Sequence, residues 1–202
     1  GTRCFDSRDE WLAARNDHLG ASEVAAAIGL DEYCSPYTLW ARKKGLLPER
    51  EATIPMELGT LIEPWLGDKV RTMTGLKVQP ADQCVTIYNT DTPWLQATPD
   101  AGITFADGVK GPLELKSVEA WSADDWKDDA PSKYLIQLQM QMYCTDTTRG
   151  MLAALVGKSQ IKTVKVDRHD KLIASIVAKA HEFWDSLKLE VPPMIDGSVS
   201  TA

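Results

Sequence analysis

Residues that serve as soft metal ligands are scarce in this 202-residue sequence, which has three histidines and four cysteines. Cys4, Cys34, Cys84 and Cys144 lie far apart, and no two of them form a Cys-x-x-Cys pair. This spacing argues against a zinc site or an iron–sulfur cluster and fits reduced thiols in a cytoplasm. Long apolar runs are absent too, and the first residues, Gly1–Ser7, lack the pattern of a signal peptide. We therefore expect a cytoplasmic protein with no membrane partner.

An excess of basic residues is also lacking. The chain has 22 Lys and Arg against 29 Asp and Glu, which gives a formal net charge of −7. Proteins that simply coat nucleic acid are usually basic. An acidic chain can still bind DNA through a local basic lining, so the charge disfavours a coating role more than it disfavours an enzyme. The length fits one large domain or at most two small ones. Internal repeats and clear linkers are missing, so we expect a single domain over residues 1–202.

Apolar periodicity, caps and turn residues predict the order of helices and strands. A first helix begins after a Ser7 cap, carries Trp11 and Arg15, and is broken by Leu19-Gly20. Further helices are expected over residues 21–28, 35–44, 56–74, 131–144 and 170–189, and strands over 77–79, 84–88, 95–98, 101–105, 113–118, 150–156 and 160–166. This order predicts an α/β (α+β) fold with one central mixed β-sheet flanked by helices. Residues 120–130 are expected to form a mobile loop, in which Trp121 and Trp126 either pack or stack on a base.

The candidate site begins at Pro99-Asp100 and continues at Glu114-Leu115-Lys116. Because alternate residues of a strand share a face, Glu114 and Lys116 point the same way and Leu115 points into a core. An Asp-Gly turn lies between the two segments. It predicts a hairpin that brings Asp100 beside Glu114.

The residue types at this site indicate a class of chemistry. Two clustered carboxylates repel each other unless a cation lies between them, and oxygen-only ligands suit a hard ion such as Mg²⁺ or Mn²⁺. A lysine beside such a metal is placed to position or deprotonate a water molecule. The pattern therefore indicates metal-assisted hydrolysis, with a phosphodiester as the leading substrate. The alternative is a surface hairpin with a Glu–Lys pair, since motifs this short often match by chance.

Several other polar positions have two interpretations each. Ser22 begins a short helix, where its hydroxyl and free backbone N–H groups can meet a phosphate, and Arg15 can supply positive charge. The alternatives are a plain helix cap and a solvated arginine. Glu63, in the long helix, is either a solvated acid or a site acid. Gln137 and Gln141 lie one turn apart on one helix face.

Motifs in chain order carry a resemblance to a known family. They are Trp11-x-x-x-Arg15 with Leu19-Gly20-Ala21-Ser22, Gly59-Thr60-Leu61-Ile62-Glu63, Thr98-Pro99-Asp100, Leu113-Glu114-Leu115-Lys116 and Tyr134-x-x-Gln137-x-Gln139. Together they resemble the phage lambda exonuclease family, also called YqaJ-type viral recombinases, within the PD-(D/E)XK nucleases. The resemblance covers most of the chain and implies a restriction-endonuclease-like core. One family feature is unmatched, because the loop Leu30–Cys34 lacks the basic residue that follows the Ala-Ser helix.

The resemblance implies a Mg²⁺-dependent 5′→3′ exonuclease, with Mn²⁺ expected to substitute for Mg²⁺. Its substrate would be linear double-stranded DNA, from which it releases mononucleotides and leaves 3′ single-stranded overhangs. Its partners would be double-stranded DNA ends and a single-strand annealing protein of phage-type recombination. The resemblance also implies a ring-shaped homotrimer, and a phage or prophage origin in a bacterial cytoplasm.

The family's metal site can be carried over residue by residue. The resemblance assigns metal binding to Asp100, Glu114 and the main-chain carbonyl of Leu115. Glu63 would complete a second metal site or orient its water. Lys116 would position or activate the nucleophilic water.

The same carry-over gives roles to four more side chains. Gln137 would hold the water or Lys116. Arg15, Ser22 and Thr98 would bind the 5′-phosphate of the strand end. Thr98 stands where the family has a serine, so the hydroxyl is kept and a methyl group is added.

Two other functions remain open. A PD-(D/E)XK endonuclease of restriction or repair type would keep the chemistry but would need no 5′-end pocket, so Arg15 and Ser22 discriminate between the two enzymes. A catalytically silent DNA-binding or scaffold subunit is disfavoured by the intact set of Asp100, Glu114 and Lys116.

Overall fold

The computed structural model describes residues 1–48, 53–119, 124, 126, 130–157 and 159–195. Its helices are α1 (Arg8–Ala14), α2 (Val24–Ala27), α3 (Pro36–Lys43), α4 (Ile54–Thr74), α5 (Ser132–Thr145) and α6 (Asp170–Lys188). Its strands are β1 (Thr2–Cys4), β2 (Leu19–Gly20), β3 (Lys77–Pro80), β4 (Val85–Tyr88), β5 (Leu95–Ala97), β6 (Ala101–Thr104), β7 (Lys110–Val118), β8 (Arg149–Val156) and β9 (Gln160–Asp167). Most of the predicted 120–130 loop, including Trp121, lies outside the described residues. None of the described helices is long and apolar enough to cross a bilayer.

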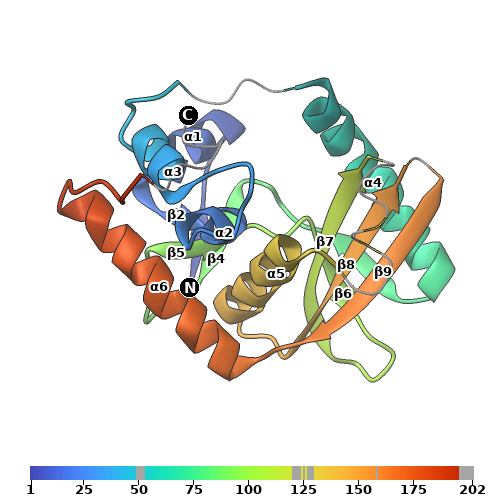
Figure 1. The fold of residues 1–202 in the computed structure, drawn as a ribbon. Helices are drawn as coiled ribbons and strands as arrows, with labels where there is room; N and C mark the ends of the chain where they lie inside the picture. The colour runs from blue at the N-terminus through green and yellow to red at the C-terminus, as the bar shows by residue number, and fades with distance from the viewer. Residues whose placement is uncertain (49–52, 120–123, 125, 127–129, 158, 196–202) are drawn as a thin grey trace.

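The larger sheet has the strand order β3-β6-β7-β8-β9. The sheet is mixed, because β7 and β8 are parallel while the pairs β3–β6, β6–β7 and β8–β9 are antiparallel. Helix α4 packs on one face and α5 on the other, as Figure 1 shows around the labelled strands β7 and β8. The predicted α/β fold, with a central mixed sheet flanked by helices, is confirmed.

A second sheet, which the sequence does not predict, has the order β1-β4-β5-β2. Its edge strands β1 and β2 contain three and two residues, too few for apolar alternation to be visible. The Leu19-Gly20 pair does end the first helical segment, but it continues as strand β2. There it pairs in parallel with β5, Leu19 opposite Leu95 and Gly20 opposite Gln96. This pairing joins the N-terminal segment to the strand that leads to Asp100.

Strand β7 separates the core from the site by simple alternation. Leu115 packs with Leu66 and Val70 in the core under α4. Glu114 and Lys116 have the opposite orientation and face α5, as the period of two predicts. The hairpin register pairs Ala101 of β6 with Leu113 of β7, so Asp100 comes next to Glu114.

Trp126 is a packing residue. It is 2% exposed and stacks on Tyr134 with ring centroids 5.8 Å apart. Its backbone carbonyl also accepts a hydrogen bond from Lys162. Of the two interpretations of this tryptophan, packing is therefore correct and stacking on a base is wrong, because the ring is already covered by protein.

His18 is buried, and its surroundings predict a pH-dependent stability. Burial, reinforced by the charge of Lys43, lowers the pKa of His18 from 6.5 to about 4, although Glu23 acts in the opposite direction and Arg3 adds to the lowering. Between pH 6.5 and pH 4, His18 is therefore protonated in the unfolded chain but neutral in the folded chain. The free energy of unfolding falls as the pH drops through this range. Between pH 7 and pH 5 we expect a loss of about 2 kcal/mol in unfolding free energy.

Urea unfolding at the two pH values measures this loss. The variant His18→Gln should remove most of the difference between them. His181→Gln, in which an exposed histidine paired with Asp185 is replaced, is the matched control and should leave the difference intact. Equal pH dependence in wild type and His18→Gln would contradict the assignment.

Candidate active site

Asp100 is fixed by the backbone of the neighbouring strand. Its Oδ2 accepts a hydrogen bond of 2.7 Å from the backbone N–H of Leu115. This bond crosses from the start of β6 to β7, so the carboxyl group lies directly beside the strand that carries Glu114. The structure thus brings together the two acids that the sequence predicts to be neighbours.

Glu114 is buried at 2% exposure and each of its carboxylate oxygens has a partner. Its Oε1 accepts hydrogen bonds from Lys116 Nζ at 2.5 Å and from Gln137 Nε2 at 2.6 Å. Its Oε2 accepts one from Gln141 Nε2 at 2.5 Å. A buried carboxylate is costly unless it is paired and hydrogen-bonded, and here one cation and two amides supply that compensation.

Burial and neighbouring charges shift the pKa values of the ionisable groups in the cluster. Burial and the nearby charge of Glu114 raise the pKa of Asp100 well above its ordinary value. The same two causes, burial and Glu114, raise the pKa of Glu63 on α4. Burial alone would lower the pKa of Lys116, but the attraction of Glu114 and Asp100 outweighs it and raises the pKa. Asp100 and Glu63 therefore both lie close enough to Glu114 for its charge to disfavour their ionisation.

The donor set fits a hard cation in kind. Asp100, Glu114, Glu63 and the carbonyl of Leu115 offer only oxygen, which is what Mg²⁺ and Mn²⁺ prefer. Within the residues that the structure describes, no group of three or more His, Cys, Asp or Glu side chains is arranged to hold a metal ion. Lys116 and the two glutamines occupy the oxygens of Glu114. A cation at this place would exchange with the ammonium group of Lys116.

An open cleft leads to the cluster between α4 and the end of β7. Its volume is about 370 Å³, and its lining residues include Glu63, Leu115 and Lys116. Thr60 and Ser117 add hydroxyl groups to its walls. Glu63 and Lys116 are therefore reachable from solvent through this cleft, and Lys116 in turn contacts the buried Glu114.

The residues predicted to bind a 5′-phosphate come from segments that adjoin strands β2 and β5. Arg15 lies over the ring of Trp11, 5.3 Å from its centroid, and its guanidinium is 3.7 Å from Glu23. Ser22 is exposed in a 3₁₀ turn over Ala21–Glu23, directly after β2. Thr98 is half-buried directly after β5, the parallel partner of β2, so both hydroxyls lie at the same end of this strand pair.

Sequence reasoning missed three residues near the site. Helical spacing places Gln141 on the face of Gln137, but the sequence does not predict its hydrogen bond to Glu114. Arg8 lies close enough to Glu63 to lower its pKa, against the larger effect of burial. Lys133 lies 4.4 Å from the ring centroid of Tyr33, and so brings a positive charge to the Leu30–Cys34 loop. Only Gln141 had a visible signal, its spacing.

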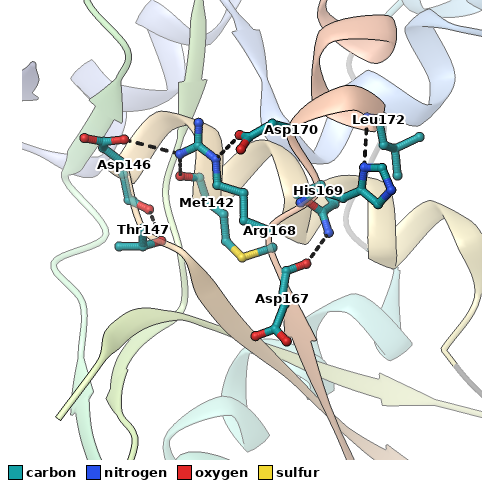
Figure 2. A network of polar contacts seen from close by, with 10 residues as sticks. Met142, Asp146, Thr147, Asp167, Arg168, His169, Asp170 and Leu172 are labelled. Atoms are coloured by element: carbon teal, nitrogen blue, oxygen red, sulfur yellow. Dashed lines mark hydrogen bonds and ion pairs between the residues drawn. The ribbon is translucent and has the colours of Figure 1, made fainter. Parts of the chain in front are cut away.

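Gln139, the last residue of the Tyr-x-x-Gln-x-Gln motif, has a structural role. Its amide donates to the carbonyl of Asp167 at 3.0 Å and accepts from the N–H of His169 at 3.0 Å. Figure 2 shows this junction, where Arg168 lies between Asp146 and Asp170. These contacts fix α5, which carries the two site glutamines, to the end of β9.

Comparison with known proteins agrees with this geometry. A family model described as a YqaJ-like viral recombinase domain matches residues 10–148. The uncharacterized protein YqaJ of Bacillus subtilis is 28% identical over 197 residues, and the match covers 95% of this chain and 60% of that protein. The chain thus spans 60% of the length of this curated relative.

Solved structures share the fold. The crystal structure of an alkaline exonuclease from Laribacter hongkongensis is 25% identical, with a TM-score of 0.74 over 91% of this chain and 94% of that one. The same enzyme in complex with dAMP gives 24% identity and a TM-score of 0.75 over 91% and 94% of the two chains. The family model covers more than half of the sequence and includes Asp100, Glu114, Lys116 and Gln137. The chain therefore belongs to the family of YqaJ-like viral recombinase domains.

Proposed function

We propose that this chain is an exonuclease-type nuclease that hydrolyses phosphodiester bonds at the cluster of Asp100, Glu114 and Lys116. The observation that carries the proposal is the buried carboxylate of Glu114, held by a lysine and two amides beside a second acid. A hairpin with a merely structural role needs no buried acid, because burial of a carboxylate costs stability. The alkaline exonuclease from Laribacter hongkongensis, which has the same fold, supports the reaction class.

Mg²⁺ is the proposed cofactor, with Mn²⁺ as a substitute. Asp100, Glu114, Glu63 and the carbonyl of Leu115 would hold it. When bound, the ion lowers the pKa of a water molecule and stabilises negative charge on the phosphate. Lys116, whose ammonium group lies 2.5 Å from Glu114 Oε1, would orient the attacking water by donating a hydrogen bond to it. The two glutamines keep this carboxylate in one orientation.

Recognition of a 5′ end is proposed for Arg15, Ser22 and Thr98. A terminal phosphate carries more negative charge than an internal phosphodiester, and an arginine can pair with it through two parallel hydrogen bonds. Arg15 is 41% exposed at its side chain and its contact with Glu23, at 3.7 Å, is longer than a hydrogen bond. The guanidinium is therefore available to an incoming phosphate. Lys133, which lies beside Tyr33, would contact the phosphate backbone of the duplex.

The polarity and the metal requirement are tested with linear duplex DNA labelled at either the 5′ or the 3′ end. We expect early release of 5′-labelled mononucleotides in Mg²⁺, none in excess EDTA, and no attack on covalently closed circles. The control is the same duplex without a 5′-phosphate, which should be digested more slowly. Cleavage of circles would favour the endonuclease, and full activity in EDTA would remove the metal from the proposal.

The proposed assembly is a ring-shaped homotrimer that works on DNA ends with a single-strand annealing protein. This proposal rests on family resemblance, and closed symmetry gives each subunit the same pair of contacts. Sedimentation should give about three times the 22.3 kDa of one chain. A mass of one chain at micromolar concentration would contradict the ring.

A further inference from the structure

Lys43, at the end of α3, is a buried cation with three partners. Its side chain is 2% exposed. Its ammonium group donates to the carbonyl of Arg15 at 3.0 Å, to the carbonyl of His18 at 2.8 Å and to Glu23 Oε2 at 2.9 Å. An ammonium group has three N–H donors, so all of them are used. One side chain from α3 thus fixes both the backbone that carries Arg15 and the acid that faces it.

Glu23 faces both Lys43 and Arg15, but its contact with Lys43 is much closer than its contact with Arg15. Its Oε2 accepts from Lys43 and also from the backbone N–H of Gly20 at 2.8 Å. Its Oε1 is left opposite the guanidinium of Arg15 at 3.7 Å. An acid whose charge is already compensated by a buried cation holds a second cation weakly. Arg15 therefore stays on the ring of Trp11, half-exposed, instead of closing onto Glu23.

We infer that Lys43 is a positioning residue for the 5′-end pocket, an inference that rests on the proposed end recognition by Arg15. By neutralising Glu23, Lys43 leaves the charge of Arg15 for a terminal phosphate. By holding the carbonyls of Arg15 and His18, it also fixes the segment between α1 and β2 from which the guanidinium extends. Without Lys43, the uncompensated Glu23 would compete with the phosphate for Arg15.

The test compares initial rates on 5′-phosphorylated and 5′-hydroxyl linear duplex, expressed as a ratio for each variant. Lys43→Met keeps the length of the side chain and removes its charge, and should lower the ratio about tenfold. The double variant Lys43→Met/Glu23→Gln removes the competing acid as well and should restore the ratio to within about twofold of wild type. Arg15→Ala gives the floor of the ratio.

The neighbouring Lys44 is the matched control, since it lies next to Lys43 but pairs at the surface with Glu190. Lys44→Met should leave the ratio unchanged. An equal loss on both substrates in Lys43→Met, or a double variant no better than the single one, would show a merely structural role and overturn the inference.

Three further outcomes keep the test decisive. If Lys43→Met does not fold, Glu23→Gln alone carries the test: its ratio should equal or exceed that of wild type, and a lower ratio overturns the inference. A wild-type ratio of one would reject the end pocket itself, and the role of Lys43 with it. A wild-type ratio above one that Lys43→Met leaves unchanged would reject the role of Lys43 alone.

Discussion

Replacement of Lys116 by alanine is expected to reduce cleavage by about a thousandfold or more and to leave DNA binding near the wild-type level. Lys116 is the cation nearest the buried carboxylate, at 2.5 Å from Glu114 Oε1. Its removal takes away the group that we propose orients the attacking water, while the acids that would hold the metal stay in place. Single-turnover cleavage and a binding assay in Ca²⁺ separate the two effects.

The control for this prediction lies on the same strand. Lys110 also belongs to β7 but is exposed, so Lys110→Ala removes an equal side chain away from the cluster. It should cleave at the wild-type rate. Near wild-type turnover in Lys116→Ala would rule out the assigned site, and parallel losses in both variants would point to the strand rather than to the lysine.

Local rules were sufficient for the centre of the site. The period of two along β7 predicts that Glu114 and Lys116 share a face, and the Asp-Gly turn predicts the hairpin. Both predictions are confirmed. A slip of one residue along β7 would turn Glu114 into the apolar core under α4 and Leu115 towards the glutamines of α5, so the register is strongly specified. Sequence reasoning works here because the signal lies within a few residues of the chain.

Local rules were not sufficient where distant segments meet. Lys43 is a basic residue in the last turn of α3, a place where lysines commonly lie in solvent. Its burial depends on carbonyls some 25 to 28 residues earlier in the chain. Gln141 likewise shows only a helical spacing, and its partner Glu114 comes from a strand 27 residues away. The sequence does not predict the small second sheet for the same reason, since its edge strands pair with segments far away in the chain.

The variant Asp100→Asn is expected to lose cleavage and to become more stable at the same time. Burial and the charge of Glu114 raise the pKa of Asp100, so its ionised form is unfavourable in the folded chain without metal. Asparagine has the same shape and can still accept from the N–H of Leu115, but it carries no charge. We expect Tm without metal to rise by about 3 °C, and turnover in Mg²⁺ to fall by about a hundredfold or more.

Asp107 supplies the matched control, because it belongs to the same hairpin and has the opposite electrostatics. A hydrogen bond from Arg149 lowers the pKa of Asp107, so its charge is favourable in the folded chain. Asp107→Asn should therefore lower Tm slightly and leave cleavage intact. Calorimetry with and without Mg²⁺ measures the opposite Tm changes expected for the two variants, and cleavage rates measure their activities. If Asp100→Asn lowered Tm and kept turnover, the acid would be a structural hairpin residue, and the cluster would not be the place where the phosphodiester is cut.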